Sequence, residues 1–498
     1  MTLTHILVFC IITVLLIWIG RGRWRGWLLL VASVLAIYWL QPSTPIRNLD
    51  FWLPTASVGL VVLVWAATRP GETIVQRQDL ITSGVMAGLI LVIALTRYFD
   101  PLCCLTPTRP PALPLVIAAL GGVTLVAIVT IRLSPKNLRL DALYIMMILA
   151  IFLVLKTPAL AQATSGGLRT ISGQVAGLAT PLDLRWLGFS YLAFRLIHTL
   201  RDRMNGKLPG LSLMDFTTYA IFFPAVTAGP IDRVQRFSGD LQKMQAATTL
   251  SNTSGGSAKG FKAILSPISL SWQDAYEGGQ RILLGIFKKF VVADSLAIIA
   301  LNSINAPQTT STGWMWVLVY AYSLRLYLDF SGYTDIAIGL GRLVGIHLPE
   351  NFDNPYLKPN LTAFWNSWHI TLAQWFRSYF FNPVTRSLRT NPHNFPLPAI
   401  IFVGQLSTMV LIGLWHGVTW NFAAWGLWQG IGLFIHNRWS EATRTRFSEL
   451  DIHPGFKSAM TISGILLTFN YVTIGWVWFA LPTLSSSWHV LLMLFGIR

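Results

Sequence analysis

Residues 398–416 read PAIIFVGQLSTMVLIGLWH, a run of eighteen uncharged residues followed by a histidine. A bilayer core about 30 Å thick needs about 20 apolar residues in a helix, so this run is long enough to cross a membrane. Comparable candidate spans are 4–20, 27–41, 51–68, 80–96, 112–131, 142–163, 184–200, 212–229, 281–303, 312–346 (as one or two pieces), 398–415, 420–437 and 458–481. The sequence therefore predicts an all-α, polytopic membrane bundle of roughly 11–14 helices, including re-entrant ones.

Composition agrees with lipid as the main solvent. Of 498 residues, 53% are hydrophobic and 11% are charged, with a mean hydropathy of +0.55, whereas soluble domains carry about 25% charged residues. The net charge of +17 fits Lys and Arg concentrated in cytoplasmic loops. No basic run is interleaved with solvent-facing structure, so we expect no nucleic-acid partner.

The charged loops predict a topology for the first half of the chain. Basic loops alternate with less basic ones at residues 21–26, 69–79, 132–141 and 200–207. This alternation places the N-terminus outside, and the apolar run 5–20, which no cleavage site follows, reads as a retained first span. Because loop 231–280 is basic too, either the span 212–229 is re-entrant or the count is wrong by one.

Common catalytic and metal-binding motifs do not occur. The sequence has no GxSxG, Walker, HExxH or CxxC pattern. The three cysteines, Cys10, Cys103 and Cys104, form neither a disulfide framework nor zinc-ligand spacing. We therefore expect no metal site and no permanently bound cofactor.

The strongest candidate for chemistry is His416, at the end of the run quoted above. Gly413 and Gly417 flank it, which leaves room for a ligand or a neighbouring backbone to approach. A desolvated, neutral imidazole is a usable general base near pH 7. A packing histidine bonded to a neighbouring helix fits the spacing equally well.

Two further clusters of polar residues lie in apolar surroundings. In residues 364–380, FWNSWHITLAQWFRSYF, helical spacing places Trp365, His369, Leu372 and Phe376 on one face, and an interfacial amphipathic helix also explains the tryptophans. In residues 325–336, RLYLDFSGYTDI, Arg325 precedes Asp329 by one helical turn, and Asp335 follows. A structural Arg–Asp ion pair is the simpler interpretation there.

Four segments together resemble the membrane-bound O-acyltransferase family, in particular its bacterial alginate O-acetyltransferase and teichoic acid D-alanyl transferase branch. They are GIFKKFVVAD (285–294), the run 327–356 that contains DFSGYTD, FWNSWHITLAQWFRSY (364–379) and LIGLWHGVTWNFAAWGLWQG (411–430). Their order and spacing are specific. The likeness covers about residues 184–440.

The resemblance implies roles for particular residues. The WHG histidine maps to His416 as the catalytic residue, and the second functional histidine maps to His369. The family's tunnel takes a thioester donor, acyl-CoA or an acyl carrier protein, from the cytosol and an acceptor from the other side. Further candidate substrate-binding residues are Trp365, Trp415, Trp420, Asn421, Lys288 and Lys289. The two lysines suit either donor phosphates or anionic lipid.

Departures from the family pattern leave the acceptor open. Ser367 stands where arginine is frequent, Arg377-Ser378-Tyr379 where Arg-Asp-Tyr is usual, and Arg325 where glutamine is common. Residues 70–131 resemble an extra helical pair. We divide the chain into N-terminal helices (1–165), a catalytic core (166–440) and a C-terminal segment (441–498).

The resemblance implies an enzyme of the cell membrane that moves a short acyl group from a thioester onto a hydroxyl of an extracytoplasmic glycan. Its expected partners are membrane lipid, the acyl donor and a periplasmic or extracellular acyltransferase. A transporter or flippase of a lipid-linked glycan also explains the spans and buried charges, and a catalytically dead scaffold is a second rival. Retention of both histidines argues against the scaffold.

Overall fold

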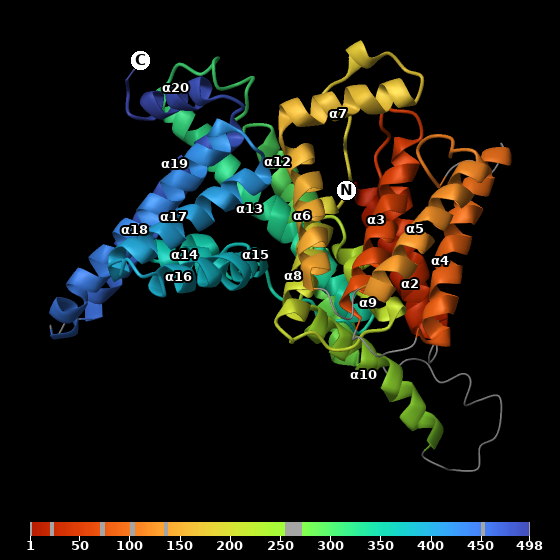
Figure 1. Ribbon diagram of the computed structural model, residues 1–498. Helices are drawn as coiled ribbons and strands as arrows, with labels where there is room; N and C mark the ends of the chain where they lie inside the picture. The colour runs from red at the N-terminus through yellow and green to blue at the C-terminus, as the bar shows by residue number, and fades with distance from the viewer. Residues whose placement is uncertain are drawn as a thin grey trace. The chain divides into compact units, whose positions relative to one another are not determined.

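The computed structural model describes residues 2–19, 24–69, 75–99, 105–133, 138–253, 271–449 and 454–497. Cys103, Cys104, His453 and most of the Ser/Gly-rich segment 250–260 lie outside these ranges. Within them the regular structure is helical, apart from an isolated bridge between Phe352 and Trp368. The prediction of an all-α fold is confirmed (Figure 1).

The chain divides into two compact units, one of Met1–Leu283 with Asp335–Pro349 and the other of Leu284–Thr334 with Glu350–Arg498. The three-segment division expected from the sequence stays a prediction. The first unit holds these α-helices: α1 (Leu3–Ile19), α2 (Trp24–Leu40), α3 (Leu49–Thr68), α4 (Arg77–Leu95), α5 (Leu113–Leu133), α6 (Leu138–Lys156), α7 (Pro158–Ile171), α8 (Phe189–Met204), α9 (Leu213–Ala220), α10 (Val234–Thr253) and most of α11 (Trp272–Ile286).

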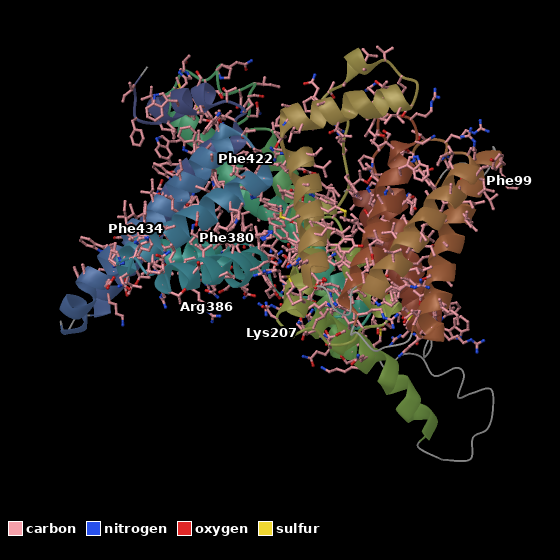
Figure 2. All side chains as sticks on the ribbon, viewed as in Figure 1. Phe99, Lys207, Phe380, Arg386, Phe422 and Phe434 are labelled. Atoms are coloured by element: carbon pink, nitrogen blue, oxygen red, sulfur yellow. The ribbon has the colours of Figure 1, made fainter. Side chains whose placement is uncertain are left out.

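The second unit holds the elements that later form the site. They are the π-helix η6 (Phe287–Ala293), α12 (Asp294–Ala297), most of α13 (Thr312–Leu343), α14 (Leu361–Ser367), α15 (Ile370–Phe376), the π-helix η8 (Arg377–Phe381), α16 (Asn382–Arg389), α17 (Leu397–His416), α18 (Trp420–Glu449), α19 (Pro454–Ala480) and α20 (Leu484–Leu494). Figure 2 shows side chains filling the spaces between helices within each unit.

Six helices in the described part of the chain are long and apolar enough to cross a membrane. They are Leu49–Thr68, Arg77–Tyr98, Leu113–Leu133, Leu138–Lys156, Leu397–His416 and Gly455–Ala480. The protein is therefore a multi-pass membrane protein, as predicted.

The expected span 142–163 is wrong at its C-terminal end. Helix α6 ends at Lys156 because Thr157 is extended and Pro158, which has no N–H, begins α7. Figure 1 shows α7 turning across the end of α6. Helix α7 is held by Asp183, whose carboxylate accepts hydrogen bonds from Ser165 at 2.6 Å and from Arg169 at 2.9 Å.

The expected span 212–229 is also not a continuous helix. Its helix α9 has eight residues, about 12 Å of rise, which is too short to cross a bilayer. The re-entrant path of this segment stays a prediction, which this short helix allows. Arg195 of α8, 2% exposed, satisfies this segment's backbone by donating to the carbonyls of Ala220 at 2.9 Å and Ala225 at 3.0 Å.

Two other spans differ from expectation in opposite ways. The candidate 281–303 breaks into α11, η6 and α12, whereas 312–346 forms the single long helix α13. Gly332 of α13 allows close packing against this broken segment, because a Cβ there would lie 2.8 Å from the Gly285 carbonyl oxygen and 3.0 Å from the Lys289 backbone nitrogen.

Replacing Arg195 with methionine tests the support of the re-entrant segment. The change leaves the carbonyls of Ala220 and Ala225 without these donors, and we expect the free energy of unfolding to fall by about 2–4 kcal/mol. Thermal unfolding in detergent measures this as a lower Tm. Arg201→Met on the same helix is the control and should stay within about 0.5 kcal/mol of the wild type. If Arg195→Met has the same Tm as the control, the hydrogen bonds from Arg195 to the two carbonyls do not stabilise this segment.

Candidate functional site

His416 is the last residue of α17, and α18 begins four residues later. The two helices touch backbone to backbone here, because a Cβ at Gly413 would clash with the Phe422 carbonyl oxygen and one at Gly417 would lie 2.8 Å from the Phe422 ring. The sequence predicted that these glycines leave room for either a ligand or a neighbouring backbone. The structure shows a neighbouring helix packed against them. This packing fixes the His416 imidazole against the rings of Phe422 and Phe479, at centroid distances of 5.9 and 4.7 Å.

The sequence predicted one helix through Trp365, His369 and Phe376, and this prediction is wrong. The helix is broken at His369. Helix α14 ends at Ser367, Trp368 is extended, and His369 has a left-handed backbone with φ 44° and ψ 53° before α15 begins. A left-handed conformation is costly for a residue with a Cβ and is frequent at functional sites. The break therefore marks His369 as a residue held in place by its surroundings.

Asn351 provides much of that support. It is fully buried, its backbone carbonyl accepts a hydrogen bond from the Ile370 N–H at 2.9 Å, and its side-chain oxygen accepts one from the Thr371 hydroxyl at 2.6 Å. The bridge between Phe352 and Trp368 continues the contact. These bonds tie the start of α15 to a neighbouring loop on both sides of His369.

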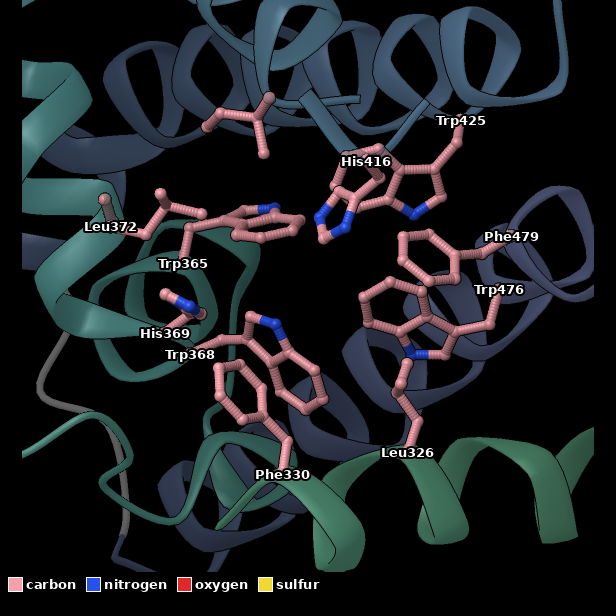
Figure 3. Close-up of a pocket in the computed structure, with 12 residues that line it drawn as sticks. Leu326, Phe330, Trp365, Trp368, His369, Leu372, His416, Trp425, Trp476 and Phe479 are labelled. Carbon is pink, nitrogen blue, oxygen red and sulfur yellow. The ribbon is translucent and has the colours of Figure 1, made fainter. Parts of the chain in front are cut away.

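His369 and His416 line the same cavity, of about 60 Å³ (Figure 3). A volume of this size has room for a group of a few heavy atoms. The other lining residues are almost all apolar or aromatic: Leu326, Phe330, Trp365, Trp368, Leu372, Ala373, Ile412, Trp425, Trp476 and Phe479. In Figure 3 the His416 ring projects into the middle of this group, and His369 lies on the other side of Trp365.

His369 is 5% exposed, and neither of its ring nitrogens has a hydrogen-bond partner. It lies outside the six candidate spans. Burial lowers its pKa to about 3, so the ring is neutral near pH 7 with one N–H donor and one bare acceptor. Buried polar atoms without partners are rare in proteins, and this pair is available to a bound substrate.

A second, more polar chamber of about 180 Å³ adjoins the first, and Trp365, Ala373 and Ile412 line both. Its polar lining residues are Thr362, Asn366, Arg377, Gln405, Thr408 and Asn437. The Arg377 guanidinium donates to the Asn366 side-chain oxygen at 2.6 Å, and the buried Gln405 side-chain oxygen has no partner. The pair of chambers joins an apolar, histidine-bearing end to a polar, cationic end.

Comparison with known proteins agrees with this geometry. The model of the membrane-bound O-acyltransferase family matches residues 142–473, about two thirds of the chain. The chain belongs to this family. Membership makes it an O-acyltransferase and confirms the resemblance read from the sequence.

Three relatives show how broad this family is. A teichoic acid D-alanyltransferase of Streptococcus thermophilus is 31% identical over 60% of this chain and 68% of its own length. A probable alginate O-acetylase of Azotobacter vinelandii is 32% identical over 62% of this chain and 54% of its own length. A peptidoglycan O-acetyltransferase of Helicobacter pylori is 35% identical over 60% and 52%, respectively. The chain thus spans about half the length of the last two.

The other residues predicted to bind substrate in this O-acyltransferase are spread over several environments. Trp365 lines both chambers. Trp415 is buried and lines neither chamber, and its ring centroid lies 4.4 Å from that of His416 and 6.3 Å from that of His369. Trp420 is 79% exposed at the start of α18. Asn421 donates to the Leu481 carbonyl at 2.7 Å, so its amide joins α18 to the segment before α20. Neither Trp420 nor Asn421 lines the cavity.

The lysines lie on the π-helix η6, away from the lining residues of the histidine cavity. Lys289 pairs with Asp329. The expected pair between Arg325 and Asp329 is therefore wrong, since a residue from another helix takes that carboxylate. Asp335 likewise pairs outside its own helix, with Arg281 at 2.5 Å.

Four further residues that line the cavity were not predicted from the sequence. Leu326 and Phe330 of α13 and Trp476 and Phe479 of α19 line the cavity. Each pair is spaced by three or four residues, which places it on one helix face. That spacing is ordinary in apolar spans and does not distinguish a cavity wall from helix packing.

The buried, neutral state of His369 predicts a pH-dependent stability. A histidine whose pKa is about 3 when folded and about 6.5 when unfolded binds protons more readily in the unfolded state. Its contribution is present above the unfolded pKa and is lost as the pH falls below it.

We expect acidification from pH 7.5 to 5 to lower the free energy of unfolding of the wild type by about 2 kcal/mol more than that of His369→Gln. Thermal unfolding in detergent across this pH range measures the difference. Equal slopes in the two proteins would show that His369 is not held neutral.

Proposed function

We propose that the protein transfers a short acyl group from a thioester to a hydroxyl of an extracytoplasmic glycan, with His416 as the general base. The observation that carries this proposal is the joint placement of His416 and the unpartnered His369 in one apolar cavity. A small cavity suits an acetyl group or another acyl group of similar size. The relatives named for alginate, peptidoglycan and teichoic acid support a polymeric, extracytoplasmic acceptor.

In the proposed reaction, neutral His416 accepts the proton of the acceptor hydroxyl as its oxygen attacks the thioester carbonyl carbon. His369 orients a substrate through its free ring nitrogens, which have no competing partner inside the protein. The aromatic walls exclude bulk water, and this protects the thioester from hydrolysis. A covalent acyl–histidine intermediate is a variant of the same scheme.

The polar chamber is the proposed path for the donor's polar arm. Amide groups of such an arm match the unpartnered Gln405 oxygen and the side chains of Thr362 and Asn437. Phe381, which directly precedes α16, lines this chamber. Arg386 and Arg389 of α16 are exposed, and Figure 2 labels Arg386. Exposed arginines favour the cytosolic side.

Several parts of the proposal rest on the family and on topology alone. The donor is acyl-CoA or an acyl carrier protein, the membrane is the cell membrane, and a periplasmic or extracellular acyltransferase is a partner. Lys288 and Lys289 meet donor phosphates or anionic lipid from η6. A flippase needs a passage for a glycan, and a cavity of about 60 Å³ that ends at two histidines suits a small acyl group better.

Purified protein supplied with an acyl thioester and an acceptor glycan should release free thiol and acylate the acceptor. We expect His416→Ala to lower kcat at least about 10²-fold, because general-base catalysis contributes about 10²–10⁴-fold. The exposed His393, replaced by alanine, should leave kcat unchanged. Folding of each variant is checked by its Tm in detergent. Normal acyl transfer by a folded His416→Ala protein would rule out the proposed base.

A further inference from the structure

Two indole N–H groups in the histidine cavity have no hydrogen-bond partner. Trp365 and Trp425 line the cavity, are 8% and 1% exposed, and each buries its Nε1 without an acceptor. An N–H group buried without an acceptor costs on the order of 1–3 kcal/mol in a folded protein. Two such donors in one small cavity indicate a ligand that brings an acceptor.

Both donors are close to the proposed base. The Trp425 ring lies 6.0 Å from the His416 ring at an interplanar angle of 81°, and 5.7 Å from the Trp365 ring at 80°. Figure 3 shows the nitrogens of Trp365 and Trp425 on either side of the His416 imidazole. A group that reacts beside His416 therefore lies close to both indole rings.

A third tryptophan of the same cavity provides an internal comparison. Trp476 also lines it, but its Nε1–H already donates to the Tyr356 hydroxyl at 3.2 Å. Its ring stacks on Trp425 at a centroid distance of 5.6 Å. Trp476 therefore supplies the same kind of apolar surface as Trp425 without an available donor.

The chemistry of acyl transfer requires such donors. When a hydroxyl attacks a thioester, negative charge develops on the carbonyl oxygen, and donors aimed at that oxygen stabilise the transition state. The side chains that line the cavity include no hydroxyl, amide or cationic group. Indole and imidazole nitrogens are their only hydrogen-bonding atoms. His416 takes the hydroxyl proton, and His369 lies on the other side of Trp365 (Figure 3), which leaves the indole N–H groups as the donors beside His416.

We propose that the indole N–H groups of Trp425 and Trp365 form the oxyanion-binding site of this enzyme. The inference rests on the proposed acyl transfer and extends it to two further catalytic residues. Indole is a donor only and carries no charge, so it stabilises the oxyanion without supplying a proton to the thioester or competing with His416 for one.

Acyl transfer in this cavity is an addition to the carbonyl followed by an elimination of the thiol. The acceptor oxygen forms a bond to the carbonyl carbon, its proton moves to His416, and the carbonyl π electrons move onto oxygen between the two N–H groups. On collapse the C=O bond re-forms and the C–S bond breaks. The leaving sulfur takes the proton from the His416 imidazolium and departs as a free thiol.

The Trp365 and Trp425 rings meet at an interplanar angle of 80°. The near-perpendicular arrangement of Trp365 and Trp425 allows an N–H edge to meet a neighbouring ring face, a weak interaction of second order. An oxyanion is a far better acceptor than a ring face. When the N–H groups exchange a ring face for the oxyanion, the transition state is stabilised relative to the cavity without substrate.

Replacing single tryptophans with β-(3-benzothienyl)alanine tests the inference, because sulfur takes the place of the indole N–H while ring shape is kept. With an acyl-CoA donor and an acceptor glycan, we expect the change at Trp425 to lower kcat about 10²-fold with little change in KM. The change at Trp365 should lower kcat in the same direction. The matched control is Trp428, which lines neither chamber and whose Nε1–H donates to the Tyr471 carbonyl at 3.1 Å. The same change there should leave kcat within about threefold.

An infrared measurement separates catalysis from packing. In the His416→Ala background, a ¹³C-labelled thioester carbonyl should absorb at a lower wavenumber when Trp425 is intact than when it is replaced by the benzothienyl residue. Unchanged kcat and an unchanged carbonyl frequency at both Trp425 and Trp365 would overturn the oxyanion assignment. Absence of acyl transfer in the unmodified protein would instead overturn the proposed function, so the two failures are distinguishable.

Discussion

A polar group buried among apolar helices has no water to bind, so its hydrogen bonds must be made inside the protein or with a ligand. Several structural polar groups in the described part of this chain make their hydrogen bonds inside the protein. Arg195 satisfies the carbonyls of the re-entrant segment, Asp183 holds α7, and Asn421 joins α18 to the segment before α20. These groups stabilise the fold because their partners come from distant parts of the sequence.

Several polar groups of the histidine cavity instead have no hydrogen-bond partner inside the protein, so they are available to a ligand. Both nitrogens of His369 and the N–H groups of Trp365 and Trp425 are buried without partners around a space of a few heavy atoms. His369 is in addition held in a left-handed backbone conformation by Asn351 and its neighbours. Unpaired polar atoms and backbone strain both reduce stability. Because they lie in one cavity with His416, in a member of an acyltransferase family, we propose that the chemistry takes place there.

The sequence predicts the bundle well, because a bilayer demands long apolar runs and such runs are visible without a structure. It does not distinguish spanning from re-entrant segments, since the eight-residue α9 and the broken segment 281–303 are apolar too. Ion-pair partners were missed for a related reason: Asp329 meets a lysine forty positions earlier, whereas sequence reasoning favoured the arginine one turn away.

The sequence likewise predicts only part of the candidate site. The two histidines stand out because each interrupts an apolar or aromatic run, and their family motifs are local. The break between Trp368 and His369 leaves no trace in the helical spacing around it. Trp476 and Phe479 reach the cavity from another helix, and only packing brings them there.

The central claim is that acyl transfer takes place in the histidine cavity. A structure of the protein bound to a non-reactive ketone analogue of the acyl thioester tests it most directly. The expected result places the carbonyl carbon in the space between His416 and His369, with its polar arm in the adjoining chamber. An analogue bound with its carbonyl outside the cavity, while His416 and His369 keep their present surroundings, would contradict the central claim.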